Sequence, residues 1–561
     1  MVVLGIIVGI AGGYGAVGFR YLINFIQSIA YGSPNELLDV VKSVPWYLRI
    51  AIPAIGGLIV GPTVYFFARE AKGHGVPEVM HAVALKQGII RKRIVFIKAL
   101  VSAVCIGTGG SVGREGPIVQ IGSAVGSSLG QLFQVSTNRI RTMVGCGAAA
   151  GIAATFNAPI AGSIFALEII LGEFEIDSFS PIIISAVAAT AISRYYLGDF
   201  PAFILPTYEL NSLLEFPLYA LLGVLCALVA VGFTLFLYRA EDVWDSIKFP
   251  EYLKAVVGGL MMGAMGLVFP QVLGVGYGAI DLALMVKLSW WLMALLVLFK
   301  ILATSITIGS GGSGGIFAPS LFMGAMAGGA FGQIVHSLFP SVAASAGAYG
   351  VVGMGAVVAA TTHGPLQAIL IIFEMTGTYK IILPLMITCI ISCLIAGRLC
   401  GESIYTFKLI RRGVNIKAGK EVNVLKSMPV KNVMYHTVEI VPENLSLKAL
   451  AETLPHSRSN NFVVVNDKEE IAGVLTFFDY YDALFNEKLD DHMAVKDIMT
   501  PDVVTVSIED NLATALEKIT ADDFAILPVV EVENPLKMLG ILTRRDILEA
   551  YDQAVIKKAI S

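Results

Sequence analysis

Charged residues are scarce in this chain, and their scarcity decides its broad class. Only 15% of the 561 residues are Asp, Glu, Lys or Arg, whereas a soluble domain carries about 25%. Hydrophobic residues make up 56% and the mean hydropathy is +0.75, so much of the chain must face lipid. The formal net charge of −4 is small and negative. It argues against nucleic acid as a partner, because such a partner requires a basic surface.

Other absences narrow the function further. The six cysteines all lie in apolar segments, which argues against a disulfide framework and against a zinc site. The apolar part holds no cluster of Asp and Glu, so no metal site is predicted. No nucleophile with a matching base is recognisable, and we expect no enzyme. A charged leader with a cleavage site is also lacking. Because the chain opens directly in an apolar helix, we expect that a first helix is missing or truncated.

The composition changes sharply along the chain. Residues 1–412 consist of apolar segments interrupted by Gly and Pro, several of them shorter than the ~20 residues that span a bilayer. This pattern predicts an all-α, polytopic membrane domain with broken, half-membrane helices. Residues 413–429 form a polar linker. The rest is a soluble α/β repeat, because VKNVM and GVLTFFD in 430–490 recur as VKDIM and GILTRRD in 491–553.

The membrane part is itself duplicated. Residues 107–117 read GTGGSVGREGP and residues 309–319 read GSGGSGGIFAP, at an offset of 202. Ten of the 25 positions that start at the first stretch are identical at this offset, and the lone cations Lys98 and Lys300 share it. Two repeats that each carry a glycine-rich helix start are typical of a transporter whose ion site lies near the membrane midplane.

Glycine-rich helix starts favour an anion as the bound ion. A helix N-terminus presents free N–H groups and about half a positive charge, and glycine lets an anion approach that backbone closely. We place four such starts at Gly73–Pro77, Gly113–Pro117, Gly315–Pro319 and in the region preceding Tyr405. The alternative is that the glycines only allow close helix packing. Packing alone does not explain the adjacent arginine and glutamate inside GREGP.

The segments GSVGREGP, GGIFAP and SIYTFKL resemble the CLC chloride channel and transporter family. The repeated G-x-L-T-x-x-D of the tail resembles a tandem pair of cystathionine-β-synthase (CBS) domains. The resemblance covers essentially the whole chain. It implies a homodimer with a separate anion pathway in each subunit, and a membrane domain of two inverted repeats. Chloride or another small anion, the lipid bilayer and protons are the expected partners.

By this resemblance Glu115 is the gating glutamate, whose carboxylate competes with the anion and leaves the site when it is protonated. The amides of Ile316 and Phe317 line the central anion, and Tyr405 is the inner-gate tyrosine. The alternatives are that Glu115 merely pairs with Arg114 and that Tyr405 is an ordinary interfacial tyrosine. The candidate anion-site residues are His74, Gly113, Arg114, Glu115, Gly116, Gly315, Ile316, Phe317 and Tyr405.

Two positions depart from the family pattern. His74 stands where a small hydroxyl residue is usual. An imidazole gains a charge near physiological pH, so we hypothesise altered selectivity or pH sensitivity; the alternative is a histidine turned away toward a backbone partner. Ile169 stands on the proton pathway from Glu115, where proton-coupled members commonly carry a carboxylate, and it cannot hold a proton. Glu168 and Glu374 end equivalent segments, and we expect both to be hydrogen-bonded at helix ends.

Three functions therefore compete. Glu115 together with Tyr405 favours an anion/proton exchanger. Ile169 favours a passive anion channel of the same family. A CBS-regulated transporter of another ion is the remote alternative, because the acidic cluster that a cation requires is absent. We favour the exchanger, an integral multi-pass membrane protein whose CBS pair lies in the cytoplasm, since basic residues follow the last membrane segment.

The membrane site requires no cofactor, whereas the CBS resemblance allows an adenine nucleotide in the tail. Thr476, Asp479, Thr543 and Asp546 are the candidate ligands, each Asp taking ribose hydroxyls. The alternative is that each Thr caps the following helix and each Asp supports its first turn. The CBS pair would then serve only dimerisation.

Overall fold

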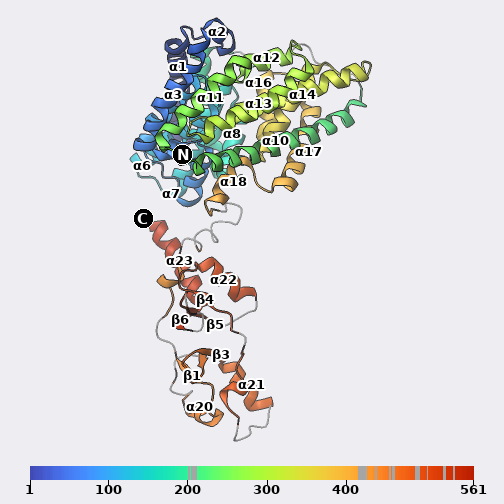
Figure 1. Ribbon diagram of the computed structural model, residues 1–561. Helices are drawn as coiled ribbons and strands as arrows, with labels where there is room; N and C mark the ends of the chain where they lie inside the picture. The colour runs from blue at the N-terminus through green and yellow to red at the C-terminus, as the bar shows by residue number, and fades with distance from the viewer. Residues whose placement is uncertain are drawn as a thin grey trace. The chain divides into compact units, whose positions relative to one another are not determined.

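The computed structural model describes residues 1–199, 203, 212–414, 425, 428–435, 439–453, 457, 461–486, 493–501, 503–521, 526–532, 534 and 537–560. It divides into two compact units, Met1–Gly413 and Val414–Ser561. Most of the predicted linker at 413–429 lies outside the described residues. Among the described residues, every strand belongs to the second unit, and the first unit is built from helices (Figure 1).

The first unit is a helical membrane domain, as the composition predicts. Eight helices in the described part of the chain are long and apolar enough to cross a bilayer. The helices of the first half are α1 (Val2–Tyr31), α2 (Leu37–Ser43), α3 (Trp46–Phe67), η1 (Arg69–Ala71), α4 (Val76–Leu85), α5 (Arg93–Gly107), α6 (Glu115–Leu132), α7 (Thr137–Phe156), α8 (Pro159–Phe165), the π-helical turn η2 (Ala166–Leu171) and α9 (Ile176–Leu197).

The second half repeats this order. Its helices are α10 (Glu215–Ser246), α11 (Glu251–Val268), η3 (Pro270–Val272), α12 (Tyr277–Leu284), α13 (Trp290–Gly309), α14 (Phe317–Leu338), α15 (Ala346–Thr362), α16 (Pro365–Thr376), η4 (Tyr379–Ile381), α17 (Ile382–Cys400) and α18 (Ile404–Arg411).

Short helices interrupt the long ones at equivalent places in the two halves. α7 is capped by Asn157 and α15 by His363, both in the left-handed region with φ of 58° and 54°. Two residues later a proline begins the next helix, Pro159 in α8 and Pro365 in α16. Proline suits this first position because its missing N–H has no partner there in any case. α16 has only 12 residues, too few to span a bilayer, which confirms the predicted broken helices.

Contacts between the two halves are exchanged in pairs. Glu168 accepts hydrogen bonds from the amides of Leu366 and Gln367 at the start of α16, at 3.2 and 2.7 Å. Glu374 in return accepts hydrogen bonds from two amides at the start of α8, at 3.1 and 2.7 Å. The expectation that both carboxylates bind helix ends is confirmed. Such reciprocal contacts relate the halves by a two-fold axis, as two inverted repeats require.

Glycines set the helix spacing in both halves. A Cβ added to Gly122 in α6 would lie 2.2 Å from the carbonyl oxygen of Gly147 in α7. In the second half, a Cβ added to Gly324 in α14 would lie 2.3 Å from the carbonyl oxygen of Gly353 in α15. Neither distance leaves room for a side chain, so the backbones touch, as is common for helices in membranes. For these glycines the packing interpretation is confirmed.

The second unit contains two equivalent sheets. In each, the first strand pairs parallel to the second and the second pairs antiparallel to the third. The elements are η5 (Val430–Asn432), β1 (Ile440–Pro442), α20 (Leu447–Thr453), β2 (Asn461–Val465), β3 (Ile471–Thr476), α21 (Phe477–Asn486), η7 (Val495–Asp497), β4 (Val506–Ser507), α22 (Leu512–Ala521), β5 (Ile526–Val530), β6 (Met538–Thr543) and α23 (Arg544–Ile560).

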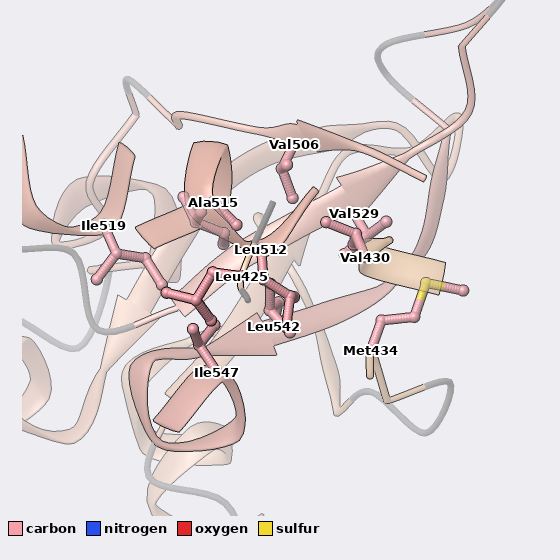
Figure 2. Close-up of a cluster of buried hydrophobic side chains, with 11 residues drawn as sticks. Leu425, Val430, Met434, Val506, Leu512, Ala515, Ile519, Val529, Leu542 and Ile547 are labelled. Carbon is pink, nitrogen blue, oxygen red and sulfur yellow. The ribbon is translucent and has the colours of Figure 1, made fainter. Parts of the chain in front are cut away.

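The two repeats of the tail exchange short segments. Val430 and Met434, at the start of the first repeat, are buried in a core cluster with residues from β4 to α23 of the second repeat (Figure 2). Val495, at the start of the second repeat, is buried with residues of β1 to β3. Backbone hydrogen bonds agree, because Tyr435 pairs with Ile541 at 3.0 Å in both directions. Each packed unit therefore combines residues from both 430–490 and 491–553.

Candidate anion-binding site

Three glycine-rich loops meet inside the membrane domain. Gly113 and Gly315 exchange two backbone hydrogen bonds, at 2.7 and 2.6 Å. Gly73 donates to the carbonyl of Gly312 at 3.1 Å and accepts from the amide of Gly314 at 3.3 Å. Glycine is required here, since a Cβ on Gly315 would lie 2.7 Å from the backbone nitrogen of Gly116. The structure thus brings three of the four predicted loops together.

Two helices begin at this junction in matching register. α6 starts at Glu115 and α14 starts at Phe317, the pair related by the offset of 202. The third residue of each helix is a proline, Pro117 or Pro319, and the amides before it have no acceptor within the helix. Two helix N-termini, each carrying about half a positive charge, therefore meet at one place. The buried aromatic ring of Phe317 packs against that of Phe156, with centroids 5.6 Å apart.

The Glu115 carboxylate occupies the space between these helix starts. Its side chain is 1% exposed, and Oε2 has no hydrogen-bond partner. A Cβ built on Gly113 would lie 2.0 Å from this oxygen and 3.2 Å from the amide nitrogen of Ala318, so the oxygen faces the first turn of α14. The arrangement is a negative group seated where two positive helix ends converge.

Tyr277 holds the other carboxylate oxygen. Its hydroxyl donates to Glu115 Oε1 at 2.9 Å, and it is the first residue of α12, after Gly276 at φ 90°. The guanidinium of Arg114 lies over the Tyr277 ring, 5.3 Å from its centroid. Tyr277, Arg114 and Arg20 line a cavity of about 200 Å³. Arg114 therefore faces this cavity rather than forming a salt bridge with Glu115.

His74 and Tyr405 flank the junction from another side. A Cβ built on Gly116 would lie 2.2 Å from the carbonyl oxygen of His74, so the histidine abuts the start of α6. The rings of His74 and Tyr405 are 5.8 Å apart, and both side chains are buried. Among the described residues, no hydrogen bond involves the Tyr405 hydroxyl, which leaves it free to donate.

The His74 ring is oriented by one side chain. Nε2 lies 3.3 Å from the hydroxyl of Tyr238 in α10, and that hydroxyl donates to the carbonyl of Ile404 at the start of α18. Nδ1 is buried and has no partner. The ring therefore turns toward Tyr238 and not toward a backbone acceptor.

Two buried lysines fix the loops that carry these groups. Lys98 donates to the carbonyls of Ala71 and Gly73, at 3.0 and 2.8 Å. Lys300 donates to the carbonyls of Val272 and Gly274, at 3.1 and 3.0 Å. The first pair precedes His74 and the second precedes Tyr277, so each half uses its lysine in the same way.

Tyr277 and the loop before it are not among the site residues that the sequence predicts. GHGVP at residues 73–77 and GVGYG at residues 274–278 are related at an offset of 201, and Gly75 and Gly276 share a positive φ of 84° and 90°. A comparison of the two halves that allowed this one-residue change of offset would have identified the loop before Tyr277 as the counterpart of GHGVP. The start of α18, predicted to be glycine-rich, is instead capped by Ser403, whose hydroxyl accepts from the amide of Thr406.

Ile169 and the candidate nucleotide ligands of the tail are not among the residues that contact the Glu115 carboxylate. Ile169, in η2, packs against the start of α16, since a Cβ on Gly364 would lie 2.6 Å from its Cδ1. In the tail, Thr476 Oγ1 donates to Asp479 at 2.8 Å and accepts from its amide at 3.3 Å.

Thr543 and Asp546 repeat this arrangement, at 2.6 and 3.2 Å. Both pairs are therefore capping boxes of the helices that follow them. Asp546 and Glu549 also line a cavity of about 370 Å³.

A multi-pass membrane domain in which helix N-termini converge on a buried carboxylate is the architecture of an anion transporter. Residues 56–397 match the family described as "Voltage gated chloride channel", and residues 495–553 match the CBS domain. The chain belongs to this CLC family of chloride channels and transporters. It is an integral membrane protein of a family that transports anions, and it is not an enzyme.

Some relatives are named chloride channel proteins and others are named proton/chloride exchangers. The chain is 35% identical over 409 residues to a putative ClcB-like chloride channel protein of Ralstonia nicotianae, covering 72% of this chain and 95% of that protein. It is 31% identical over 418 residues to the H(+)/Cl(−) exchange transporter ClcA of Salmonella paratyphi B, covering 72% and 87%. The solved structure of a slow cyanobacterial Cl−/H+ antiporter superimposes with a TM-score of 0.67 at 29% identity, covering 73% of this chain and 97% of that one.

Proposed function

We propose that this protein exchanges chloride, or a similar small anion, for protons across a membrane, and that Glu115 is the gate. The observation that carries the proposal is the seat of the Glu115 carboxylate, buried between the starts of α6 and α14 with Oε2 unpartnered. A carboxylate in that place excludes an anion of the same charge. Protonation removes the negative charge, so the side chain leaves and an anion takes its place.

The rest of the candidate site has matching roles. The amides of Gly113 and Gly315 bind each other's carbonyls and hold the junction together. The amides of Gly116, Ile316 and Phe317 belong to the starts of α6 and α14 and would be directed at the anion. The free hydroxyl of Tyr405 donates to the same anion from the inner side. Arg114 and Arg20 outnumber the carboxylate of Glu36 in the lining of the adjoining cavity, which leaves it with a net positive lining that attracts anions.

Transport into liposomes tests the exchange. With purified protein in vesicles that carry an outward chloride gradient, the exchanger drives protons inward against their own gradient, and the external pH rises. The second candidate is a passive channel, favoured by Ile169, which packs against α16 and offers no carboxylate. A channel moves no protons uphill, and its reversal potential equals that of chloride alone.

The tail and the assembly belong to the same proposal. Two copies of the chain form the functional dimer, each with its own pathway, and the CBS pair lies in the cytoplasm. Because Asp546 and Glu549 line its cavity, we expect that cavity to accept the ribose of adenosine and to disfavour phosphates through like-charge repulsion. This role of the cavity is supported if the protein binds adenosine more tightly than ATP and if Asp546→Asn weakens the binding of adenosine. It is contradicted if Asp546→Asn binds adenosine as tightly as the native protein does.

A further inference from the structure

Exchange requires a proton acceptor on the inner side of Glu115, and Ile169 cannot be that acceptor. In the described part of the chain, Arg114 Nε and His74 Nδ1 are the other buried, unpartnered titratable atoms beside the junction, and of these only the imidazole accepts and releases a proton near neutral pH. We propose that Glu115 and His74 pass one proton between them inside the anion site, and that His74 binds this proton together with the transported anion. The inference rests on the exchange proposed above.

The hydrogen-bond network fixes which ring nitrogen can take the proton. Tyr238 donates its only hydroxyl proton to the carbonyl of Ile404, so toward His74 it offers an oxygen acceptor. Nε2 therefore carries the hydrogen of the neutral imidazole and donates to Tyr238 at 3.3 Å. Nδ1 is left with a bare lone pair, buried and unpartnered. A lone pair repels an anion, whereas an N–H at the same position donates to one.

The position of His74 suits transfer to and from Glu115. The backbone of His74 touches the first turn of α6, because a Cβ on Gly116 would lie 2.2 Å from the His74 carbonyl oxygen. Glu115 is the residue before that glycine. Tyr405 lies beside the His74 ring with centroids 5.8 Å apart. His74 and Tyr405 therefore lie together beside the helix start that carries Glu115.

The surrounding charges link the proton to the anion. The charged groups that act on His74 are Lys98 of α5, Lys408 of α18 and Arg412 after α18, all positive. Lys408 and Arg412 have carboxylate partners of their own, at 3.7 and 2.6 Å.

Tyr238 of α10 and Tyr405 of α18 are uncharged. From α6, Gln120 lies close, since a Cβ on Gly75 would lie 2.9 Å from its Oε1, and Glu115 begins the helix. From η2, the carboxylate of Glu168 is held by amides of α16. An imidazolium among three cations is unfavourable until a negative ion arrives.

The transfer balances without any other reactant. The O–H bond of protonated Glu115 breaks, its electron pair stays on the carboxylate, and an N–H bond forms at His74 Nδ1. The anion then accepts a charge-assisted hydrogen bond from that N–H. When the anion leaves toward the outer side, the imidazolium loses its counter-charge and releases the proton toward the inner side, so that the two ions move in opposite directions. This step supplies what a carboxylate at position 169 supplies in other members.

Proton uptake on chloride binding tests the inference directly. Glu115→Gln removes the other titratable group, so any proton that enters with chloride binds elsewhere. Titration of the purified full-length variant with KCl, by calorimetry in buffers of different ionisation enthalpy, counts these protons. We expect uptake of up to one proton per chloride in Glu115→Gln. The uptake is lost in Glu115→Gln combined with His74→Ser, a variant that places a small hydroxyl donor at this position, and the chloride affinity of each variant is read from the same titration.

His81→Ser is the matched control, since His81 is a half-buried histidine on α4, the helix that follows His74, but lies outside the junction. It should leave the proton uptake of Glu115→Gln unchanged. The inference is overturned if the uptake persists when His74 is replaced, or if it disappears when His81 is replaced.

Transport separates this outcome from failure of the exchange itself. If the native protein moves no protons uphill in liposomes, the proposed exchange is wrong. If it does and His74→Ser moves as many protons per chloride, only the role of His74 is wrong. We expect His74→Ser to move chloride with proton coupling lost, and the added change Ile169→Glu to restore coupling. Rescue by that carboxylate is a result that a merely structural role of His74 would not produce.

Discussion

Replacing Tyr277 by Phe should shift the pH at which the anion pathway opens. The Tyr277 hydroxyl donates to Glu115 Oε1 at 2.9 Å, and Phe keeps the ring that packs against Arg114 while removing this bond. A hydrogen bond to a charged group contributes about 1.5–3 kcal/mol. Since 1.4 kcal/mol corresponds to a factor of ten, the seated carboxylate loses roughly a 10- to 150-fold advantage over the state in which it has left the site.

The direction of the pH shift follows from the negative charge that Glu115 carries while its side chain occupies the anion site. Tyr277 stabilises the ionised carboxylate in its seat, so its loss favours protonation and departure of Glu115. Chloride transport, measured as a function of pH in liposomes, should be half-maximal at a pH higher by about one to two units, because each pH unit is worth 1.36 kcal/mol. The pathway should then conduct at a pH where the native protein is closed.

Tyr31→Phe is the matched control. The buried Tyr31 hydroxyl donates to the carbonyl of Thr108 at 3.0 Å and does not touch Glu115. This variant should lose about 1 kcal/mol of stability, the net value of one neutral hydrogen bond, with no change in pH midpoint. If Tyr277→Phe has the native midpoint, or if both variants shift it equally, Tyr277 does not hold the gate and the reasoning is refuted.

Three further outcomes are expected. Glu115→Gln should transport chloride without proton coupling and should lose the pH dependence of gating, keeping only the dependence that proton uptake at His74 imposes on chloride binding; a variant that keeps the native pH profile would show that another group is the gate. Gly113→Ala should also weaken the pH dependence, because its Cβ would lie 2.0 Å from Glu115 Oε2 and displace the carboxylate; an unchanged profile would contradict the placement of that oxygen. Glu168→Ala and Glu374→Ala should each lower the free energy of unfolding by about 2 kcal/mol, measured by thermal unfolding in detergent, since each leaves two amides without an acceptor. A loss of stability in only one of the two variants would argue against equivalent roles for Glu168 and Glu374.

The duplication of the membrane domain was predictable because function constrains the same residues in both halves. Glycines at equivalent places touch a neighbouring backbone, as Gly122 and Gly324 do, so their spacing survives in the sequence. The roles of Glu168 and Glu374 were predictable for the same reason. Each binds the helix start of the opposite half, and the pairing repeats as a motif.

Other features could not be derived from a constant offset. The loops before α4 and α12 are displaced by one residue from the rest of the repeat, which hid Tyr277 as the counterpart of Val76. A hydrogen bond such as that from Tyr277 to Glu115 depends on tertiary approach, which the order of residues does not reveal. In the tail, the repeat units were visible, but Val430 and Val495 pack in each other's repeat. Sequence similarity marks equivalent segments and does not say which copy a segment contacts.

The account depends on one site where the starts of α6 and α14 hold either the Glu115 carboxylate or an anion. Bromide scatters X-rays anomalously and replaces chloride, so crystals of Glu115→Gln grown in bromide test it most directly. We expect an anomalous peak at the position vacated by the carboxylate, within hydrogen-bonding reach of the amides of Ile316 and Phe317 and of the Tyr405 hydroxyl. A map with no bromide there, or with bromide only in the cavity beside Arg114, would contradict the central claim.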